Sequence, residues 1–226
     1  MIASGIITQL RIGRPQPLPG HRMLSAYRAR QPVAHAVAVH ELGLDGDQVG
    51  NTRVHGGPEK AVYAYPLSGY AGWQAEFPDL AARFGPGAMG ENLVVDGLDE
   101  TSLCLGDILR CGTATLQIAQ IREPCATFAA AMGTARVVKA MTRSGRCGWY
   151  LRVLEAGMIA AGDGHDVIER PNPDWPISRF TPIAAGKAGR HDELGALVAL
   201  PGLSAYWRRK LAQRLADQQR GLPEAP

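Results

Sequence analysis

Residues 120–128 read Gln-Ile-Arg-Glu-Pro-Cys-Ala-Thr-Phe and mark the point where an expected strand gives way to an expected helix. The preceding residues, 115–121, alternate between apolar and polar side chains, which is typical of a strand. Pro124 has no N–H group, so it cannot continue a central strand, but it can open a helix at its own position. We therefore expect a helix that starts at Pro124 or Cys125 and runs to Met132.

Cys125 carries the most reactive side chain of this stretch. In the first turn of the expected helix, its sulfur would lie near unpaired N–H groups, which favour an anion. Arg122 adds positive charge nearby, and such a setting favours the thiolate, the form of cysteine that reacts and binds metals. Free cysteine is also commonly buried as a small apolar residue. Both interpretations of Cys125 fit these residues.

The composition is that of a soluble globular protein. The chain has 226 residues, of which 46% are hydrophobic and 20% charged, enough for one domain with an appendage. Its net charge of +3 is too small to indicate a nucleic-acid polymer as partner. No apolar run has the length of a bilayer span, and residues 1–10 lack the pattern of a secretory signal. We therefore expect a cytoplasmic protein without a membrane partner.

The cysteines are scattered, which is typical of a reducing compartment, and no Cys-x-x-Cys motif predicts a structural zinc site. Cys147 fits two interpretations, a second reactive thiol or part of a partly exposed turn. The four cysteines are Cys104, Cys111, Cys125 and Cys147.

A second polar motif, residues 53–60, reads Arg-Val-His-Gly-Gly-Pro-Glu-Lys. The adjacent Gly56 and Gly57 allow positive φ angles or a close approach of the backbone to a ligand. Surrounding donors suit an anion such as phosphate, although a polar turn between strands explains the same residues. The motif is not a P-loop, because it lacks the Gly-Lys-Ser/Thr ending. The donors are Arg53, His55 and Lys60.

Two further groups of polar residues are candidates for ligand contacts. Glu91 and Asn92 follow a glycine, so they either contact a ligand or satisfy their own backbone in a turn. Arg146 and Arg152 flank the expected strand that contains Trp149 and Tyr150, whose side chains should point to opposite faces of the sheet.

Short strands separated by Gly and Asp indicate a barrel or sandwich, and helices are too few for an alternating α/β sheet. Residues 158–163 and 165–168 are expected to form a closing hairpin. The other expected strands are residues 2–12, 32–41, 61–65 and 93–95, and residues 144–153 are expected to be a turn that leads into a strand. The expected helices before the tail are residues 67–76, with an extension at 79–84, and 132–141.

The composition and pattern of the sequence change near residue 170. Residues 169–178 contain three prolines and form a stiff connector. Residues 193–200 and 204–216 are helix-like, and Ser204 can cap the second helix. We therefore expect one domain over residues 1–170, and a connector with a helical appendage over residues 171–226.

Six short motifs, taken in their order along the chain, closely resemble the MOSC family, named for the C-terminal domain of molybdenum cofactor sulfurase. More narrowly, they resemble its YiiM-type branch, the 6-N-hydroxylaminopurine resistance proteins. The resemblance covers residues 33–178, and the tail is similar to the three-helix appendage of that branch. The motifs are residues 53–60, 61–65, 90–92, 106–107, 122–125 and 148–153.

The resemblance implies a mainly β protein, a MOSC-type β-barrel with peripheral helices, that binds the molybdenum cofactor, a molybdopterin. Cys125 matches the family's characteristic cysteine, and its implied role is that of a catalytic thiolate ligand to molybdenum or a carrier of sulfur. Many relatives carry Lys or Arg two residues after this cysteine, whereas this chain has Thr127. The cofactor-binding residues that we predict are Arg53, His55, Gly56, Gly57, Lys60, Glu91, Asn92, Arg122 and Arg152.

The function that the resemblance implies is the reduction of N-hydroxylated compounds, such as hydroxylaminopurines, at a molybdenum centre. Electrons would come from a separate reductase, because the sequence has neither a dinucleotide fingerprint nor clustered cysteines for an iron–sulfur group. The alternatives are a carrier of sulfur or cofactor that uses the same cysteine, and a non-catalytic globular protein. Pyridoxal phosphate binding is sometimes inferred for the family, and Lys60 would be the residue to test for it.

Overall fold

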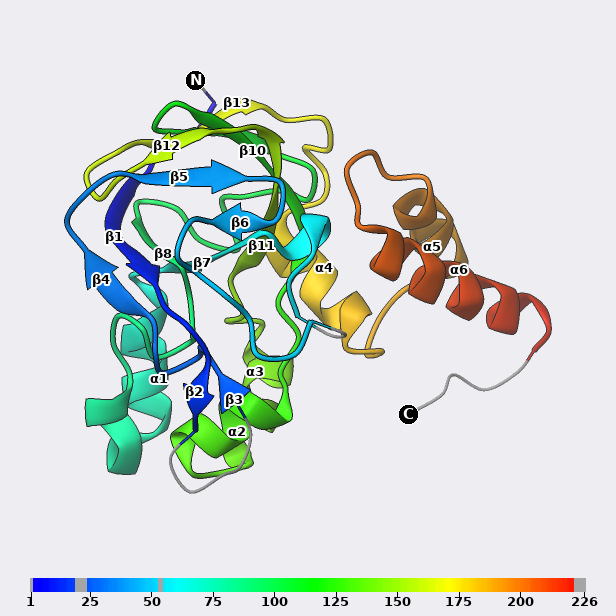
Figure 1. Ribbon diagram of the computed structural model, residues 1–226. Helices are drawn as coiled ribbons and strands as arrows, with labels where there is room; N and C mark the ends of the chain where they lie inside the picture. The colour runs from blue at the N-terminus through cyan, green and yellow to red at the C-terminus, as the bar shows by residue number, and fades with distance from the viewer. Residues whose placement is uncertain (1, 19–23, 53–54, 222–226) are drawn as a thin grey trace.

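The structure is a computed structural model that describes residues 2–18, 24–52 and 55–221 (Figure 1). Its strands are β1 (Ile6–Ile12), β2 (Gln16–Pro17), β3 (Leu24–Ser25), β4 (Gln31–Val33), β5 (Val37–His40), β6 (Gly43–Leu44), β7 (Val62–Pro66), β8 (Leu93–Asp96), β9 (Ile108–Cys111), β10 (Ala114–Ile121), β11 (Trp149–Glu155), β12 (Gly157–Ile159) and β13 (His165–Glu169). Its helices are η1 (Pro58–Lys60), α1 (Gly69–Glu76), η2 (Pro78–Arg83), α2 (Ala126–Met132), α3 (Arg136–Ser144), α4 (Ile177–Ala184), α5 (His191–Val198) and α6 (Ala205–Gln219).

An eight-stranded sheet, in the order β13-β9-β10-β11-β7-β8-β1-β4, forms the centre of the molecule. The expected β-barrel is wrong, because the described strands do not close into a continuous ladder. Strand β1 pairs with β8 on one edge and with β4 on the other, so it has no free edge for a full ladder with β13. The two meet only near the start of the chain, through isolated bridges from Ala3 to Val167 and from Ile6 to Gly164.

The expected closing hairpin is also wrong. Strand β12 pairs with β5, which lies far earlier in the chain, and β13 pairs with β9. The neighbouring apolar runs are therefore both strands, but each finds its partner elsewhere. The single strand expected over residues 32–41 is divided into β4 and β5, which belong to different sheets.

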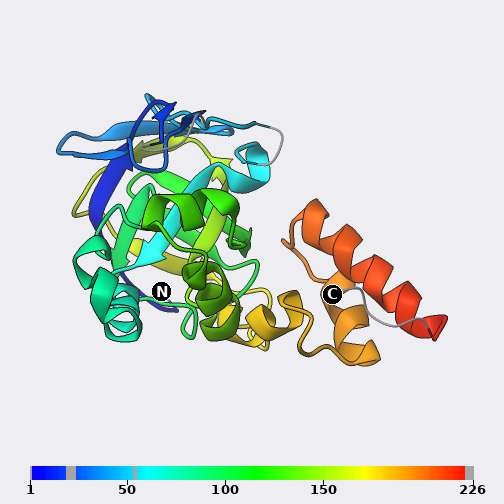
Figure 2. The ribbon, with the colours of Figure 1, turned by 90° about the horizontal axis from the view of Figure 1, so that it is seen from below.

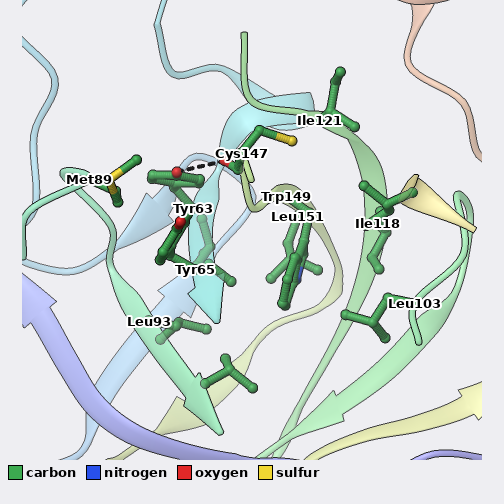
Figure 3. Packing of buried hydrophobic residues seen from close by; sticks show 14 of the residues in the cluster. Tyr63, Tyr65, Met89, Leu93, Leu103, Ile118, Ile121, Cys147, Trp149 and Leu151 are labelled. Atoms are coloured by element: carbon green, nitrogen blue, oxygen red, sulfur yellow. Dashed lines mark hydrogen bonds between the residues drawn. The ribbon is translucent and has the colours of Figure 1, made fainter. Parts of the chain in front are cut away.

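The core lies against the strands around β7 and β11. Trp149 and Leu151 are fully buried, and Figure 3 shows them near Tyr63 and Tyr65 within one cluster of apolar side chains. Burial of aromatic residues of this size contributes strongly to stability. Trp149 on one face and the half-buried Tyr150 on the other confirm the predicted alternation along β11.

Helix α1 confirms the predicted amphipathic helix, with Tyr70 and Trp73 buried. Helix α2 ends at Met132, where Gly133 adopts a left-handed conformation with φ 74. This glycine is the usual residue for such a helix end. The helix expected over residues 132–141 therefore starts later, as α3.

The last three helices lie to one side of the sheet, as Figures 1 and 2 both show. Helix α6 begins as predicted after Ser204, whose hydroxyl accepts a hydrogen bond from the backbone N–H of Trp207 at 3.3 Å. The backbone N–H of Ser204 also donates to the carbonyl of Ala119 on β10, at 2.9 Å. No helix in the described ranges is long and apolar enough to cross a bilayer.

Candidate functional site

Cys125 lies at the end of the loop that joins β10 to α2. It is the N-cap residue of α2, with an extended backbone at φ −141 and ψ 167. The expectation that its sulfur lies in the first helical turn is therefore wrong, and its side chain accepts no hydrogen bond from the helix N–H groups. Instead, its carbonyl accepts the first bonds of the helix, from Phe128 and Ala129. Cys125 is half-buried, whereas the other three cysteines are buried.

The charged side chain of Arg122 lies beside this sulfur. It is only 4% exposed, and its Nη2 lies 3.9 Å from Cys125 Sγ. Its Nη1 lies 3.1 Å from Met141 Sδ. Three aromatic rings surround the guanidinium, with centroids 4.9, 5.9 and 5.9 Å from its Cζ; they belong to Phe128, Tyr27 and Tyr63.

No carboxylate in the described part of the chain forms an ion pair with Arg122. Burial of a charge is costly unless the charge is paired. The aromatic faces and the two sulfur atoms compensate part of this cost. The arrangement can accept an anion, either the thiolate of Cys125 or a ligand.

Three cations act on the imidazole of His55. Burial lowers the pKa of His55, and the positive charges of Lys60, Arg122 and Arg30 lower it further. His55 is therefore neutral near pH 7. It interacts electrostatically with Arg122, and Lys60 interacts electrostatically with Cys125. Arg53 lies outside the described residues.

Lys60 connects the Gly-Gly motif to the sheet and to α6. Its Nζ lies 5.8 Å from the ring centroid of Tyr150 on β11 and 5.6 Å from that of Tyr206 on α6. Burial lowers its pKa, while Glu123, Glu59 and the sulfur of Cys125 act in the opposite direction.

Gly56 and Gly57 both adopt positive φ angles, 75 and 84, as predicted for a Gly-Gly turn. A Cβ at Gly57 would meet no atom within 4 Å, so the backbone here borders open space. A ligand can therefore approach this backbone closely.

Two residues near the site were not predicted from the sequence. Arg30 forms an ion pair with Asp47 at 2.7 Å and also donates to the carbonyl of Gly90. Gln120, two residues before Arg122, is 2% exposed, and its Oε1 has no hydrogen-bond partner in the described structure. No local pattern marks either residue, because the chain around each reads as ordinary strand or loop.

Glu91 and Asn92 are placed in internal hydrogen bonds. The buried carboxylate of Glu91 accepts from the hydroxyl of Tyr70 and from the backbone N–H of Met89, the latter at 3.0 Å. Asn92 accepts from the N–H of Tyr63 at 3.1 Å. These contacts hold the loop before β8 against β7 and α1.

Arg152 faces η1 and β10. It donates to Glu59 at 3.1 Å and to Gln117 at 3.2 Å, and burial lowers its pKa. Arg146 pairs with Glu76, so both arginines have carboxylate partners, unlike Arg122.

Neither interpretation of Cys147 is correct. Its side chain is only 3% exposed, and burial raises the pKa of its thiol well above the usual value. Figure 3 shows the hydrogen bond from the hydroxyl of Tyr63 to the carbonyl of Cys147, at 2.8 Å. The described residues contain no cluster of three His, Cys, Asp or Glu side chains that could hold a metal ion.

Two family models match the chain, the MOSC domain over residues 51–165 and the YiiM-like 3-alpha helix domain over residues 175–218. Protein YiiM of Escherichia coli is 34% identical over 77% of this chain and 77% of its own length. A Gibberella moniliformis protein named "Reductase" is 34% identical over 76% of this chain but only 31% of its own length.

The crystal structure of YiiM from Geobacillus stearothermophilus matches with a TM-score of 0.78 and 31% identity, over 93% of this chain and 99% of that one. That of Escherichia coli YiiM matches with a TM-score of 0.76 and 28% identity, over 92% and 94%. The chain therefore belongs to the MOSC family, as a protein of the YiiM type.

Proposed function

We propose that the protein is a reductase of N-hydroxylated compounds, such as hydroxylaminopurines, that binds the molybdenum cofactor at Cys125 and takes electrons from a separate reductase. The observation that carries the proposal is Arg122, a buried guanidinium beside a half-buried thiol, without a carboxylate partner in the described chain. The MOSC family is associated with this cofactor, and one relative is named a reductase.

The residues present fit this cofactor. A thiolate at Cys125 is a soft ligand that suits a metal with sulfur ligands of its own. Lys60 and Arg122 supply positive charge for the phosphate of the pterin. The unpaired Oε1 of Gln120 is a buried acceptor that a pterin N–H group would satisfy.

When bound, the molybdenum centre would supply the two-electron redox chemistry. The chain's own residues would ligate, orient and shield it. Arg122 would balance the negative charge of the thiolate. The rings of Tyr27 and Tyr63, which lie against the guanidinium of Arg122, would exclude water from this guanidinium. Neutral His55 carries a proton on one ring nitrogen and has the second nitrogen free to accept a proton, and on accepting it the ring would become positively charged.

The test is the reduction of 6-N-hydroxylaminopurine by protein purified from a host that makes molybdopterin, with a reductase or a chemical electron donor. We expect turnover that is lost in Cys125→Ser, because an alkoxide is a poorer ligand for a soft metal. Cys147→Ser, at a buried thiol away from solvent, should retain most of the activity. Failure of molybdenum-loaded wild-type protein to reduce the compound would contradict the proposal.

A carrier of sulfur or cofactor is the second candidate, favoured by the partial exposure of Cys125 alone among the four cysteines. Its sign would be a persulfide on Cys125, seen by mass spectrometry, in protein that reduces no N-hydroxylated compound.

A further inference from the structure

The start of α6 lies against the segment that follows the Gly-Gly motif (Figure 2). The carboxylate of Glu59, in η1, accepts a hydrogen bond from the backbone N–H of Ala205, the first residue of α6, at 2.8 Å. The same oxygen also accepts from Nη2 of Arg152 on β11, at 3.1 Å. A carboxylate is favourable at this end of a helix, because the first N–H groups have no partner within the helix. Glu59 therefore joins the Gly-Gly motif to the helical appendage.

Lys60, the next residue, makes a second contact with the appendage. Its Nζ lies over two aromatic rings from different parts of the chain, 5.8 Å from the centroid of Tyr150 on β11 and 5.6 Å from that of Tyr206 on α6. Both distances are within the range of about 6 Å over which a ring face attracts a cation. Because the four-carbon stem of lysine is flexible, two rings restrict the positions that its charge can take.

Helix α6 also contacts the loop that leads to Cys125. The Nζ of Lys210 lies 2.9 Å from the carboxylate of Glu123 and 5.6 Å from the ring centroid of Tyr206. The first turns of α6 therefore contact both segments that carry candidate site residues, the Gly-Gly motif and the loop before α2.

Lys60 also belongs to the candidate site. Its positive charge acts on His55, and the sulfur of Cys125 acts on Lys60. The side chain of Lys60 is half-buried, so it remains partly open to a ligand. Its backbone N–H donates to the carbonyl of Gly57 at 2.9 Å, and the backbone of Gly57 borders open space. An anionic group that enters here would meet an ammonium group already held in position.

We propose that Tyr206 is a positioning residue of the candidate site, whose ring holds the ammonium group of Lys60 in place for an anionic group such as phosphate. A cation that is held before the ligand arrives loses less side-chain freedom on binding, so it binds the ligand more tightly. The helical appendage is then a part of the site. That the anion belongs to the cofactor rests on the proposed function, whereas the position of Lys60 and its binding of phosphate do not.

The test uses inorganic phosphate as the probe and full-length, cofactor-free protein at constant ionic strength, with calorimetry as the measurement. Tyr206→Leu removes the ring and should weaken phosphate binding about threefold to tenfold, the range expected when one long side chain must be ordered by the ligand. Tyr206→Phe is the matched control. It keeps the ring and loses only the hydroxyl, so its phosphate affinity should be within about twofold of the wild type.

A second background tests whether the ring acts through Lys60. Lys60→Met removes the cation and should weaken phosphate binding at least as much as Tyr206→Leu does. In the Lys60→Met background, Tyr206→Leu should cause no further loss, because the two residues would act as one unit. A merely structural role of Tyr206 would give the same loss in both backgrounds.

The position of Lys60 can also be measured without a ligand. The ring currents of Tyr150 and Tyr206 should shift the NMR signal of the Lys60 Cε protons upfield, and this signal is assigned by its loss in Lys60→Met. The upfield shift should decrease in Tyr206→Leu and remain in Tyr206→Phe. Thermal unfolding of each variant verifies that it is folded.

The role of Tyr206 would be overturned by no phosphate binding to the wild type at millimolar concentration, by equal affinity in wild type and Tyr206→Leu, or by an equal loss in Tyr206→Phe and Tyr206→Leu. Any further loss in the Lys60→Met background would also overturn it, and so would an unchanged Lys60 signal in Tyr206→Leu.

Failure of this proposal can be separated from failure of the proposed function. If the wild type reduces 6-N-hydroxylaminopurine and Tyr206→Leu binds phosphate as the wild type does, the positioning role fails while the proposed function stands. If phosphate affinities follow the expected order and the protein binds no molybdenum, the proposed function fails while the role of Tyr206 stands.

Discussion

Arg122 is the residue that distinguishes the candidate site from an ordinary loop. Arg30, whose side chain is 11% exposed, has Asp47 as its carboxylate partner at 2.7 Å, whereas Arg122 faces sulfur atoms and aromatic rings. A residue that costs stability in the free protein is expected where a ligand supplies the missing charge.

We therefore predict that Arg122→Met leaves the free energy of unfolding within about 1 kcal/mol of the wild type, because replacing a poorly paired buried charge by an apolar side chain is often neutral or stabilising. Arg30→Met is the control. It should lower the free energy of unfolding by about 3–5 kcal/mol, because it leaves the carboxylate of Asp47 without its positively charged partner. Urea denaturation of cofactor-free protein measures both. A loss in Arg122→Met as large as that in Arg30→Met would contradict this account of Arg122.

At the residue scale, the sequence identifies Cys125 and Arg122 as candidate site residues, but it does not predict which side chains surround them. Tyr27, Tyr63 and Phe128 come from three separate segments, and only the folded chain brings their rings around one guanidinium. The prediction that the sulfur of Cys125 lies in the first turn of a helix is wrong, because helix α2 begins one residue later, at Ala126.

At the scale of elements, the pair of strands β9 and β13 carries a buried histidine. His165 is fully buried, its Nδ1 lies 3.1 Å from Cys111 Sγ, and burial lowers its pKa to about 4. In the unfolded chain its pKa is about 6.5. The unfolded state therefore binds more protons between these values, so the stability contributed by neutral His165 is complete above about pH 6.5 and is lost as the pH falls towards 4.

We predict that the titration of His165 alone lowers the free energy of unfolding by about 2 kcal/mol when the pH falls from 7 to 5. His165→Gln removes this titration, so its stability should depend less on pH over the same range. Urea denaturation at the two pH values measures the difference. An identical pH dependence in the two proteins would show that His165 is not held neutral.

The positions of the strands were easier to predict from the sequence than the pairing between strands. Alternation identifies β10 and the run of apolar residues identifies β7, because these signals are local. The pairing of β12 with β5 depends on residues far apart in the chain, so proximity in sequence suggested a hairpin that does not form.

At the scale of the whole molecule, Asn172 joins the sheet to the helical appendage. It is 6% exposed, and its Nδ2 donates to the carbonyl of Leu105 at 2.8 Å and to that of Pro201 at 2.9 Å. We predict that Asn172→Ala costs about 1–3 kcal/mol, because it leaves the carbonyl of the buried residue Leu105 without this donor. Urea denaturation measures this cost, and amide hydrogen exchange in α5 and α6 should become faster.

The control at the same junction is Lys210→Met, which removes an exposed ion pair with Glu123 at 2.9 Å. Such pairs contribute less than about 1 kcal/mol. If the loss of Lys210 destabilised the protein more than the loss of Asn172, charge and not buried hydrogen bonding would hold the appendage.

The sequence predicted the helical tail and its cap at Ser204, because proline positions and capping are local signals. It did not predict an open sheet, since closure depends on which strands occupy the two edges of β1. The contact between Lys60 and Tyr206 was not predictable either, because the two residues come from different parts of the chain.

The most direct test of the account is the molybdenum content of freshly purified protein from a host that makes molybdopterin, measured by mass spectrometry of the metal. We predict nearly stoichiometric molybdenum in the wild type and in Cys147→Ser, and a large loss in Cys125→Ser with the fold retained. Equal molybdenum content in wild type and Cys125→Ser would contradict the claim that this sulfur holds the cofactor.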